Sequence, residues 1–305
     1  MKIQKPRRWA FLYGLVLTAF TAYVLLDAFV IPRSYTNVQS LASGTSLTTQ
    51  VAAAENVSLS SNATITEDSY DDGNISIQLT EYEEYDTKIY VADVTLASAD
   101  SLKTAFANGT FGKNIKQTTS AMASANQAIL AINGDYYGTR NGYVIRNGVL
   151  YRSTSAGSDQ QDLVIYADGS FAIITEGDVT AQALLDQGAQ QVLSFGPALL
   201  ENGQVTVDTN AEVDQAKTSN PRTAIGIIDS LHYVFVVADG RTTESQGLSL
   251  YQLAQFMQSL GVQTAYNLDG GGSSTMVFNG EIINNPTTNG NTITERKVSD
   301  IVYIG

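Results

Sequence analysis

The chain has 305 residues, of which 43% are hydrophobic, and this is enough apolar material for a globular domain with a buried core. Its 17 lysines and arginines stand against 30 aspartates and glutamates, and the formal net charge of -13 argues against nucleic-acid binding. Cysteine is absent, which excludes disulfides, a thiolate nucleophile and a cysteine-ligated zinc site.

The N-terminus has the pattern of a membrane anchor. A basic segment, residues 1–8, precedes an apolar run over residues 9–31. A helix of this length reaches roughly 30 Å, the thickness of a bilayer's hydrocarbon core. A cleaved signal peptide is the alternative, but its apolar region is shorter, about 7 to 15 residues. Because the basic residues come first, we predict a single-pass protein of the cell membrane with residues 1–8 in the cytoplasm and the remainder outside.

A polar segment follows the apolar run. Residues 32–72 are rich in Ser, Thr, Asn and Ala and show little sustained hydrophobic periodicity. This composition is typical of a linker, so we predict a tether that holds the following domain away from the membrane. The alternative is that part of the segment is helical and packs on the domain.

Residues 73–305 are predicted to form one strand-rich domain. Apolar and polar residues alternate over 75–82 and 88–96, as they do in half-buried strands. Three further stretches, 144–151, 163–174 and 275–283, are each divided by Asn-Gly or Asp-Gly, which favours a tight hairpin turn.

Three helices are predicted in the same domain. The clearest covers 249–260, where Ser249 followed by Gln252 forms a capping-box pattern ahead of an apolar face. Weaker patterns cover 117–127 and 181–187. The expected fold class is therefore α+β, a strand-rich mixed sheet with a few packed helices, preceded by the transmembrane helix.

The most informative string follows the predicted strand 263–268. A carboxylate at the strand end is followed by three glycines and two hydroxyls, namely Asp269, Gly270, Gly271, Gly272, Ser273 and Ser274. Glycine lets the backbone approach a ligand closely, and successive free amides can form an anion-binding nest. The alternative is an ordinary glycine-rich turn.

A second string, residues 131–138, is an apolar strand that ends in polar and aromatic groups. Asp135 could act as an acid or base, and Tyr136 and Tyr137 could stack on a sugar ring. A hairpin corner with a packed tyrosine pair is the alternative.

Two arginines begin or follow strands further along. Arg222 leads the run 220–226, and Arg241 follows the strand 234–238 together with Asp239. The planar guanidinium matches the oxygens of a phosphate, so the two could hold one phosphodiester, although a single arginine is more often solvated or paired. His232 is the only histidine, and we interpret it as structural because no nucleophile elbow accompanies it.

Taken in order, the strings 133–137, 220–226, 239–241, 268–274 and 296–300 resemble the phosphodiester glycosidase family, and the resemblance covers roughly residues 128–305. It implies hydrolysis at the anomeric carbon of a sugar linked through phosphate. Its pocket would be lined by Asn133, Asp135, Arg222, Asp239, Arg241, Asp269, Gly271, Ser273 and Arg296. We predict Asp269 or Asp239 as base or transition-state stabiliser, and Arg222 and Arg241 as the phosphate clamp.

The anchor and the tether place this activity at a bacterial cell surface, on a glycan or a phosphodiester-linked wall or exopolysaccharide polymer. Two alternatives stay open: a glycan-binding module without chemistry, and an enzyme that transfers the glycosyl group to a polymer acceptor. No cofactor is expected to be required. Calcium is left open, because aspartates and asparagines lie at strand ends without forming a clustered ligand loop.

Overall fold

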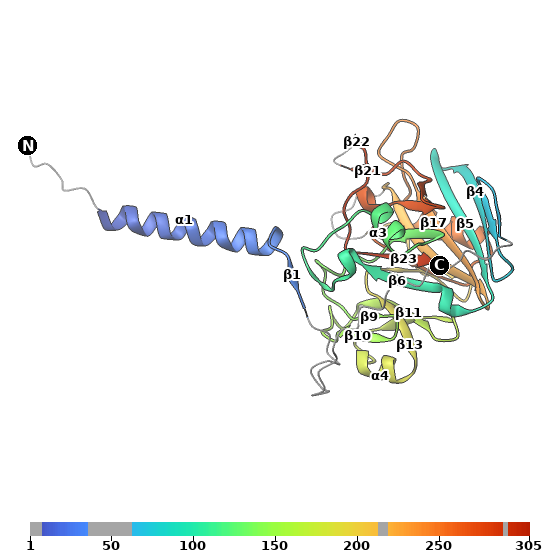
Figure 1. Ribbon diagram of the computed structural model, residues 1–305, viewed down its shortest axis with the longest axis horizontal. Helices are drawn as coiled ribbons and strands as arrows, with labels where there is room; N and C mark the ends of the chain where they lie inside the picture. Colours follow the sequence, from blue (N-terminus) through green and yellow to red (C-terminus); the bar gives the residue numbers. More distant parts are fainter. Residues whose placement is uncertain (1–7, 36–62, 213–218, 289–291) are drawn as a thin grey trace, which may run out of the picture.

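The computed structural model describes residues 8–35, 63–212, 219–288 and 292–305. Within them, helix α1 (Arg8–Phe29) extends away from a strand-rich domain (Figure 1). Residues 1–7 of the predicted cytoplasmic segment and residues 36–62 of the predicted tether lie outside the described residues.

The largest sheet has nine strands. In spatial order they are β15 (Gln204–Val205), β14 (Ala198–Glu201), β18 (Thr264–Asn267), β16 (Arg222–Asp229), β17 (His232–Ala238), β5 (Thr87–Leu96), β4 (Ile75–Glu84), β3 (Ser69–Asp71) and β2 (Thr64–Ile65). One face of this sheet is covered by α5 (Leu250–Ser259), whose buried side chains pack with those of β5, β16 and β17.

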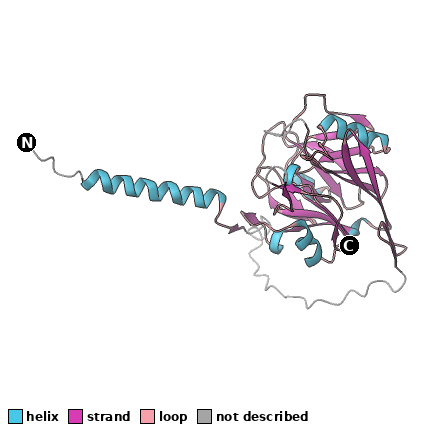
Figure 2. Cartoon of the chain, turned by 90° about the horizontal axis from the view of Figure 1, so that it is seen from above, coloured by secondary structure: helices cyan, strands magenta, loops and turns pink. Residues whose placement is uncertain are grey.

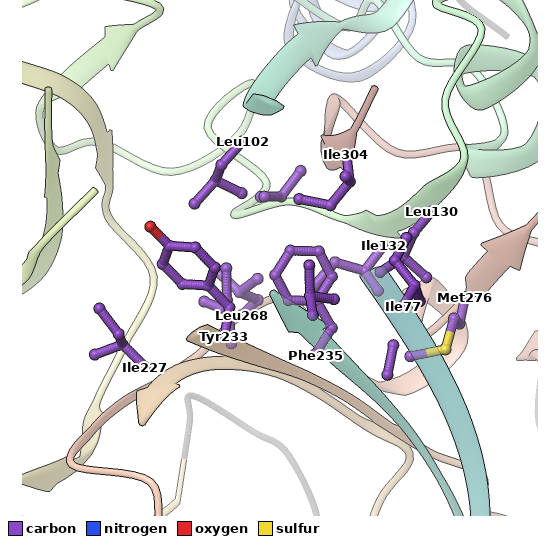
Figure 3. Close-up of a cluster of buried hydrophobic side chains, with 14 of the residues drawn as sticks. Ile77, Leu102, Leu130, Ile132, Ile227, Tyr233, Phe235, Leu268, Met276 and Ile304 are labelled. Atoms are coloured by element: carbon purple, nitrogen blue, oxygen red, sulfur yellow. The ribbon is translucent and has the colours of Figure 1, made fainter. Parts of the chain in front are cut away.

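A five-stranded sheet packs on the other face. Its order is β20 (Glu281–Ile282), β19 (Met276–Phe278), β8 (Leu130–Asn133), β23 (Asp300–Ile304) and β6 (Leu102–Phe106). The main core lies between the two sheets, where Tyr233 and Phe235 of β17 meet Ile132, Met276 and Ile304 (Figure 3). Helix α3 (Thr119–Ala125) covers the outer face of this second sheet.

A third sheet, also five-stranded, has the order β10 (Val149–Arg152), β9 (Val144–Arg146), β13 (Ala189–Leu193), β11 (Gln161–Tyr166) and β12 (Phe171–Thr175). Helix α4 (Ala181–Asp186) packs on it. Two short pairs complete the fold: β1 (Arg33–Ser34) with β7 (Gly112–Lys113), and β21 (Thr287–Thr288) with β22 (Thr292–Ile293). Figure 2 shows strands as the dominant element of the domain.

The predicted α+β class is confirmed. The strand ladders described for these sheets are all antiparallel rather than a mixture of parallel and antiparallel pairs. A helical crossover is nevertheless present in the largest sheet. β17 and β18 both pair antiparallel with β16, so they run in the same direction on either side of it, with α5 as the crossover between them.

The locally encoded elements lie where the sequence predicts them. The capping box of Ser249 and Gln252 opens α5. The hairpin β9–β10 turns at Asn147 and Gly148, which have φ of 50° and 71°, the left-handed values that a type I′ turn requires.

The predicted tether is too long at both ends. Arg33 and Ser34 pair with Lys113 and Gly112, so the chain contacts the domain directly after α1. Residues 64–71 form β2 and β3 at the edge of the nine-stranded sheet. These strands have only two or three residues, too few for a period of two to be visible in the sequence.

Helix α1 is long and apolar enough over Phe11–Phe29 to cross a membrane, and its side chains are not covered by the rest of the protein. The same composition would suit an N-terminal signal sequence. Asp27, a carboxylate near its C-terminal end, forms an ion pair with Arg33.

Candidate active site

Several strand ends meet at one edge of the two facing sheets. β8 ends at Asn133 and β18 at Asn267, while β16 begins at Arg222 and β23 begins at Asp300. Because β16 is antiparallel to β17, Arg222 lies beside Ala238, the last residue of β17. β23 is likewise antiparallel to β8, so its second residue, Ile301, lies beside Asn133, the last residue of β8. The antiparallel topology therefore brings the ends of some predicted strings beside the beginnings of others.

Asn133 joins the two sheets at this edge. Its Nδ2 donates to the backbone oxygen of Asp269 at 2.6 Å, and its Oδ1 accepts from Thr223 Oγ1 at 2.9 Å and from the Thr275 amide at 3.2 Å. The Asp269 amide in turn donates to the Gly134 carbonyl. Asn133 is fully buried. The predicted substrate contact of Asn133 is therefore corrected to a positioning role, since its hydrogen bonds hold the Asp269 backbone.

Each of the three consecutive glycines lies against an arginine from another part of the chain: Gly270 against Arg222, Gly271 against Arg241 and Gly272 against Arg296. A methyl group on Gly271 or Gly272 would lie 2.7 Å from a guanidinium nitrogen, which is closer than side-chain Cβ atoms come to other atoms. A methyl group on Gly270 would lie 2.9 Å from the Pro221 carbonyl oxygen. Gly271 and Gly272 are required because the guanidinium groups of Arg241 and Arg296 leave no room for a side chain there, whereas at Gly270 the Pro221 carbonyl oxygen does so.

The backbone amides of this segment are largely used within the protein. Gly271 donates its amide to the Pro221 carbonyl at 2.8 Å, and the amides of Ser273 and Ser274 donate to Gly270 and Gly271. Residues 271–273 form a single 3₁₀ turn, and the Ser274 side chain is fully buried. The prediction that these amides bind an anion is therefore corrected for Gly271, Ser273 and Ser274, and the positive charge at the site comes from the arginines.

Neighbouring groups orient two of the arginines. Arg222 donates from Nε to the Leu248 carbonyl at 2.9 Å. Arg241 donates from Nη2 to Asn220 Oδ1 at 3.2 Å and from Nη1 to the Thr287 carbonyl at 3.4 Å. Backbone and amide oxygens hold both side chains, and a planar guanidinium group is suited to an anionic ligand.

The electrostatics fit a site that is short of negative charge. Burial, together with nearby Arg241, lowers the pKa of Arg222 to about 10, against the opposing effect of Glu212. Burial and the neighbouring Arg296 lower the pKa of Arg241. Both groups remain protonated at neutral pH. A bound phosphate would relieve this repulsion, and the cluster stands out in a chain with a net charge of -13.

Asp269 lies next to the arginine cluster. Burial raises the pKa of its carboxyl group to about 6, while the Ser273 hydroxyl, Arg296 and Arg140 act in the opposite direction. The residue is enclosed by protein on most sides yet still partly accessible to solvent. A carboxyl group that titrates near neutral pH and borders a ligand site is suited to acid or base chemistry.

Asp239 has a different environment. Only 3% of it is exposed, and its carboxylate accepts hydrogen bonds from Asn284 Nδ2 at 3.0 Å and from the Asn285 amide and side chain at 2.9 and 3.3 Å. Burial raises its pKa, and these donors oppose the shift. Its predicted catalytic role is corrected to positioning, because the carboxylate is occupied in holding the chain at residues 284–285.

Asp135 is also occupied. It is fully buried, lies 2.9 Å from Arg146 Nη2, and accepts the amides of Tyr137 at 3.1 Å and Ser194 at 2.8 Å. Arg146 also contacts Asp300 at 2.9 Å. The predicted catalytic role of Asp135 is corrected for this reason, since a carboxylate in a buried ion cluster with two amide donors has no face left for a substrate.

The two tyrosines predicted to stack on a sugar have different environments. Tyr137 is only 2% exposed, and its ring stacks on Phe111 at 5.2 Å, so its predicted sugar contact is corrected to core packing. Tyr136 is half-buried, and the ammonium of Lys116 lies 3.2 Å from its hydroxyl and 5.0 Å from its ring centre.

A cavity beside the site was not foreseen from the sequence. It has a volume of about 250 Å³, and its lining includes Arg140, Gln160, Gln161, Phe195 and Glu212. The Arg140 guanidinium lies 4.2 Å from the centre of the Phe195 ring. Two of the lining groups act electrostatically on the site, Arg140 on Asp269 and Glu212 on Arg222. Arg140 closely follows the string 133–137, and this closeness is the only sequence signal that points to Arg140 as a site residue.

Among the residues that the structure describes, no group of three or more histidine and acidic side chains is arranged to hold a metal ion. Calcium binding stays a question that the sequence alone raises.

The site thus brings several arginines next to a carboxyl group of raised pKa, an arrangement suited to an anionic ligand. The model of the family described as Phosphodiester glycosidase matches residues 126–305, and the chain belongs to this family.

Relatives and solved structures agree with this assignment. The chain is 30% identical over 176 residues to the N-acetylglucosamine-1-phosphodiester alpha-N-acetylglucosaminidase of Mus musculus, covering 52% of this chain and 33% of the relative. It is 29% identical over 180 residues to the SPbeta prophage-derived uncharacterized protein YomE of Bacillus subtilis, covering 57% and 28%. The match thus spans about a third of the length of these relatives.

The fold resembles the solved catalytic domain of the zebrafish N-acetylglucosamine-1-phosphodiester alpha-N-acetylglucosaminidase, auto-inhibited by its pro-peptide. The TM-score is 0.60 at 22% identity, and the match covers 76% of this chain and 82% of that one. A hypothetical protein from Synechocystis has a TM-score of 0.51 at 15% identity, covering 76% and 62%. At these identities the likeness is one of fold.

Proposed function

We propose that the protein hydrolyses a sugar-1-phosphodiester bond, with Arg222, Arg241 and Arg296 holding the phosphate and Asp269 acting at the anomeric carbon. The observation that carries the proposal is that the guanidinium groups of Arg241 and Arg296 lie against Gly271 and Gly272, with the stem of Arg222 beside Gly270, directly after this aspartate. Membership of the phosphodiester glycosidase family supports a glycosidase-like activity.

The chemistry needs few groups. The bond from the anomeric carbon to the phosphate oxygen breaks, the phosphate leaves with the electron pair, and positive charge develops on the sugar ring. The three guanidinium groups, two of them held in place by hydrogen bonds, stabilise the charge on the departing phosphate. With a pKa of about 6, Asp269 is mostly ionised at neutral pH, so its carboxylate can stabilise the ring or accept a proton from the attacking water.

The cavity beside Arg140 is our candidate for the sugar. Its amide side chains, Gln160 and Gln161, and the carboxylate of Glu212 are groups that hydrogen-bond to sugar hydroxyls. The volume of about 250 Å³ suits a single small ligand group better than a long chain.

We further propose that α1 anchors the protein in a membrane, with the domain outside and the substrate a phosphodiester-linked polymer of the cell surface. The apolar length of α1 and the basic residues before it support this orientation. The detachment of α1 from the domain core also fits a helix whose apolar surface is covered by lipid.

The test uses the full chain in detergent with a set of sugar-1-phosphodiesters. We expect release of free sugar by the wild-type protein, and loss of release in Asp269→Asn with the fold retained. Asp178→Asn, an exposed aspartate on the third sheet's side of the domain, is the matched control and should turn over normally. Saturable polymer binding with no product would contradict hydrolysis, and product only with an added glycosyl acceptor would indicate a transferase instead.

A further inference from the structure

A second cavity lies on the other side of the loop formed by residues 137–142. Its volume is about 260 Å³, and Tyr35, Phe111, Lys113 and Arg152 contribute to its wall. Arg140 lines both this cavity and the one beside Asp269. The cavity is therefore next to the candidate active site without being part of it.

The wall of this cavity is cationic. Lys113, Arg140 and Arg152 line it, and none of the lining residues that the structure describes is acidic. Arg152 is tied into the loop, with Nε donating to the Gly142 carbonyl at 2.6 Å and Nη1 to the Tyr137 carbonyl at 2.9 Å. Its buried Nη2 has no hydrogen-bond partner among the described residues. The hydrogen bonds of Nε and Nη1 go to carbonyl oxygens, and Asp135 and Glu176 act on the guanidinium group electrostatically, so an anion in the cavity would supply a partner for Nη2.

The cavity also lies at the point where the chain leaves α1. Five residues separate the end of α1 from Tyr35, a reach of about 20 Å at most. The actual path is fixed, because β1 pairs with β7 and Asn114 Nδ2 donates to the Ile31 carbonyl at 3.1 Å. Tyr35 packs on Phe111 with ring centres 5.9 Å apart, and aromatic side chains are favoured at the membrane interface.

We infer that this cavity binds the phosphate of an anionic phospholipid headgroup from the membrane that α1 spans. The inference rests on the membrane anchoring proposed above. Lys113, Arg140 and Arg152 would bind the phosphate. The connection from α1 is short and pairs with β7, so it would place these side chains at the depth of the lipid headgroups. A lipid held there would also fix the loop that carries Arg140, which contributes to the charge around Asp269.

The experiment uses the full chain in detergent micelles, with native mass spectrometry to count retained phospholipids. We expect wild-type protein to retain phosphatidylglycerol in preference to phosphatidylcholine. Lys113→Gln should weaken retention about fivefold, the effect of removing one basic group near an anionic surface. Lys88→Gln is the matched control, since Lys88 is on β5, far from α1, and pairs with Glu81 at 2.7 Å.

Equal retention of phosphatidylglycerol by Lys113→Gln and wild type would overturn the inference. Displacement of the lipid by soluble glycerol phosphate at matched concentration would overturn the lipid source, because a free phosphate would then be the better ligand. Sugar release is measured on the same samples. Release without lipid retention would remove only the lipid site, whereas lipid retention without release would remove only the hydrolase.

Discussion

The packing of arginines on glycines gives a sharp test in the variant Gly272→Ala. The added methyl group would lie 2.7 Å from Nη2 of Arg296, and an ordinary contact begins at 3.4 Å, so the guanidinium must move by roughly 0.7 Å. Gly272 has no left-handed φ, unlike Gly271 at 63°, so alanine is compatible with its backbone. The variant therefore displaces Arg296 while leaving the fold in place.

The expected effect follows from the displacement. A charge-assisted hydrogen bond contributes about 1.5–3 kcal/mol, and a misplacement of about 1 Å at an active site can lower the rate about a hundredfold. We therefore expect kcat/KM of Gly272→Ala to fall roughly 10- to 100-fold. Arg296→Ala should lose a similar amount. The double variant should lose no more than Arg296→Ala alone, because both changes remove the same contact.

The assay is steady-state hydrolysis of a sugar-1-phosphodiester together with thermal unfolding. Gly157→Ala is the control, since a methyl group there meets nothing within 4 Å, and it should match wild type in both measurements. Wild-type kcat/KM in Gly272→Ala would refute the reasoning. So would full additivity of the two changes in the double variant.

Four further predictions follow from the site. Burial raises the pKa of Asp269 from 3.8 to about 6, so kcat/KM should rise with pH and level off above about 6, and a flat profile would exclude its carboxylate from the mechanism. Because of the same pKa shift, the folded protein binds a proton at Asp269 more tightly than the unfolded chain does. The contribution of Asp269 to the free energy of unfolding should therefore fall as pH rises from about 4 to 6. Urea unfolding should show this fall in the wild type but not in Asp269→Asn. Arg241→Gln should weaken phosphate binding roughly tenfold, measured as a higher KM. Arg241→Lys should have an intermediate KM, because lysine keeps the charge but lacks the planar fork of the guanidinium group. Equal KM values in the variants and the wild type would remove Arg241 from the phosphate site. Asp135→Asn should destabilise the fold by about 1–3 kcal/mol in urea unfolding while the folded fraction keeps its activity, since it weakens an acceptor of two buried amides while Arg146 keeps Asp300 as its partner, and a stable but inactive variant would restore Asp135 to catalysis.

The elements that the sequence predicts well are those with local causes. The Asn147-Gly148 turn and the capping box at Ser249 each depend on residues within four positions of one another, so their structure could be inferred from a short window. The two-residue strands β1 and β2 have no such local signal. Their pairing is decided by the edges available on the folded domain, which is why the tether was predicted too long.

The candidate site shows the same difference between features with a local cause in the sequence and features that depend on distant contacts. The string from Asp269 to Ser274 and the arginines at 222, 241 and 296 were visible as residue types suited to phosphate. Their roles were not. Asp135 and Asp239 have the same chemistry as Asp269, and only their neighbours, Arg146 for one and the chain at Asn284 for the other, show that they are structural.

What the sequence by itself determined is the inventory: an apolar helix long enough for a membrane, the hairpin turns, the amphipathic α5, and the five strings of one family in order. What the tertiary structure decided is which groups meet. Antiparallel pairing sets the start of β16 beside the end of β17, and close packing places the guanidinium groups of Arg241 and Arg296 against Gly271 and Gly272. Contacts between segments far apart in the chain depend on the whole arrangement of sheets, because no short window contains both partners.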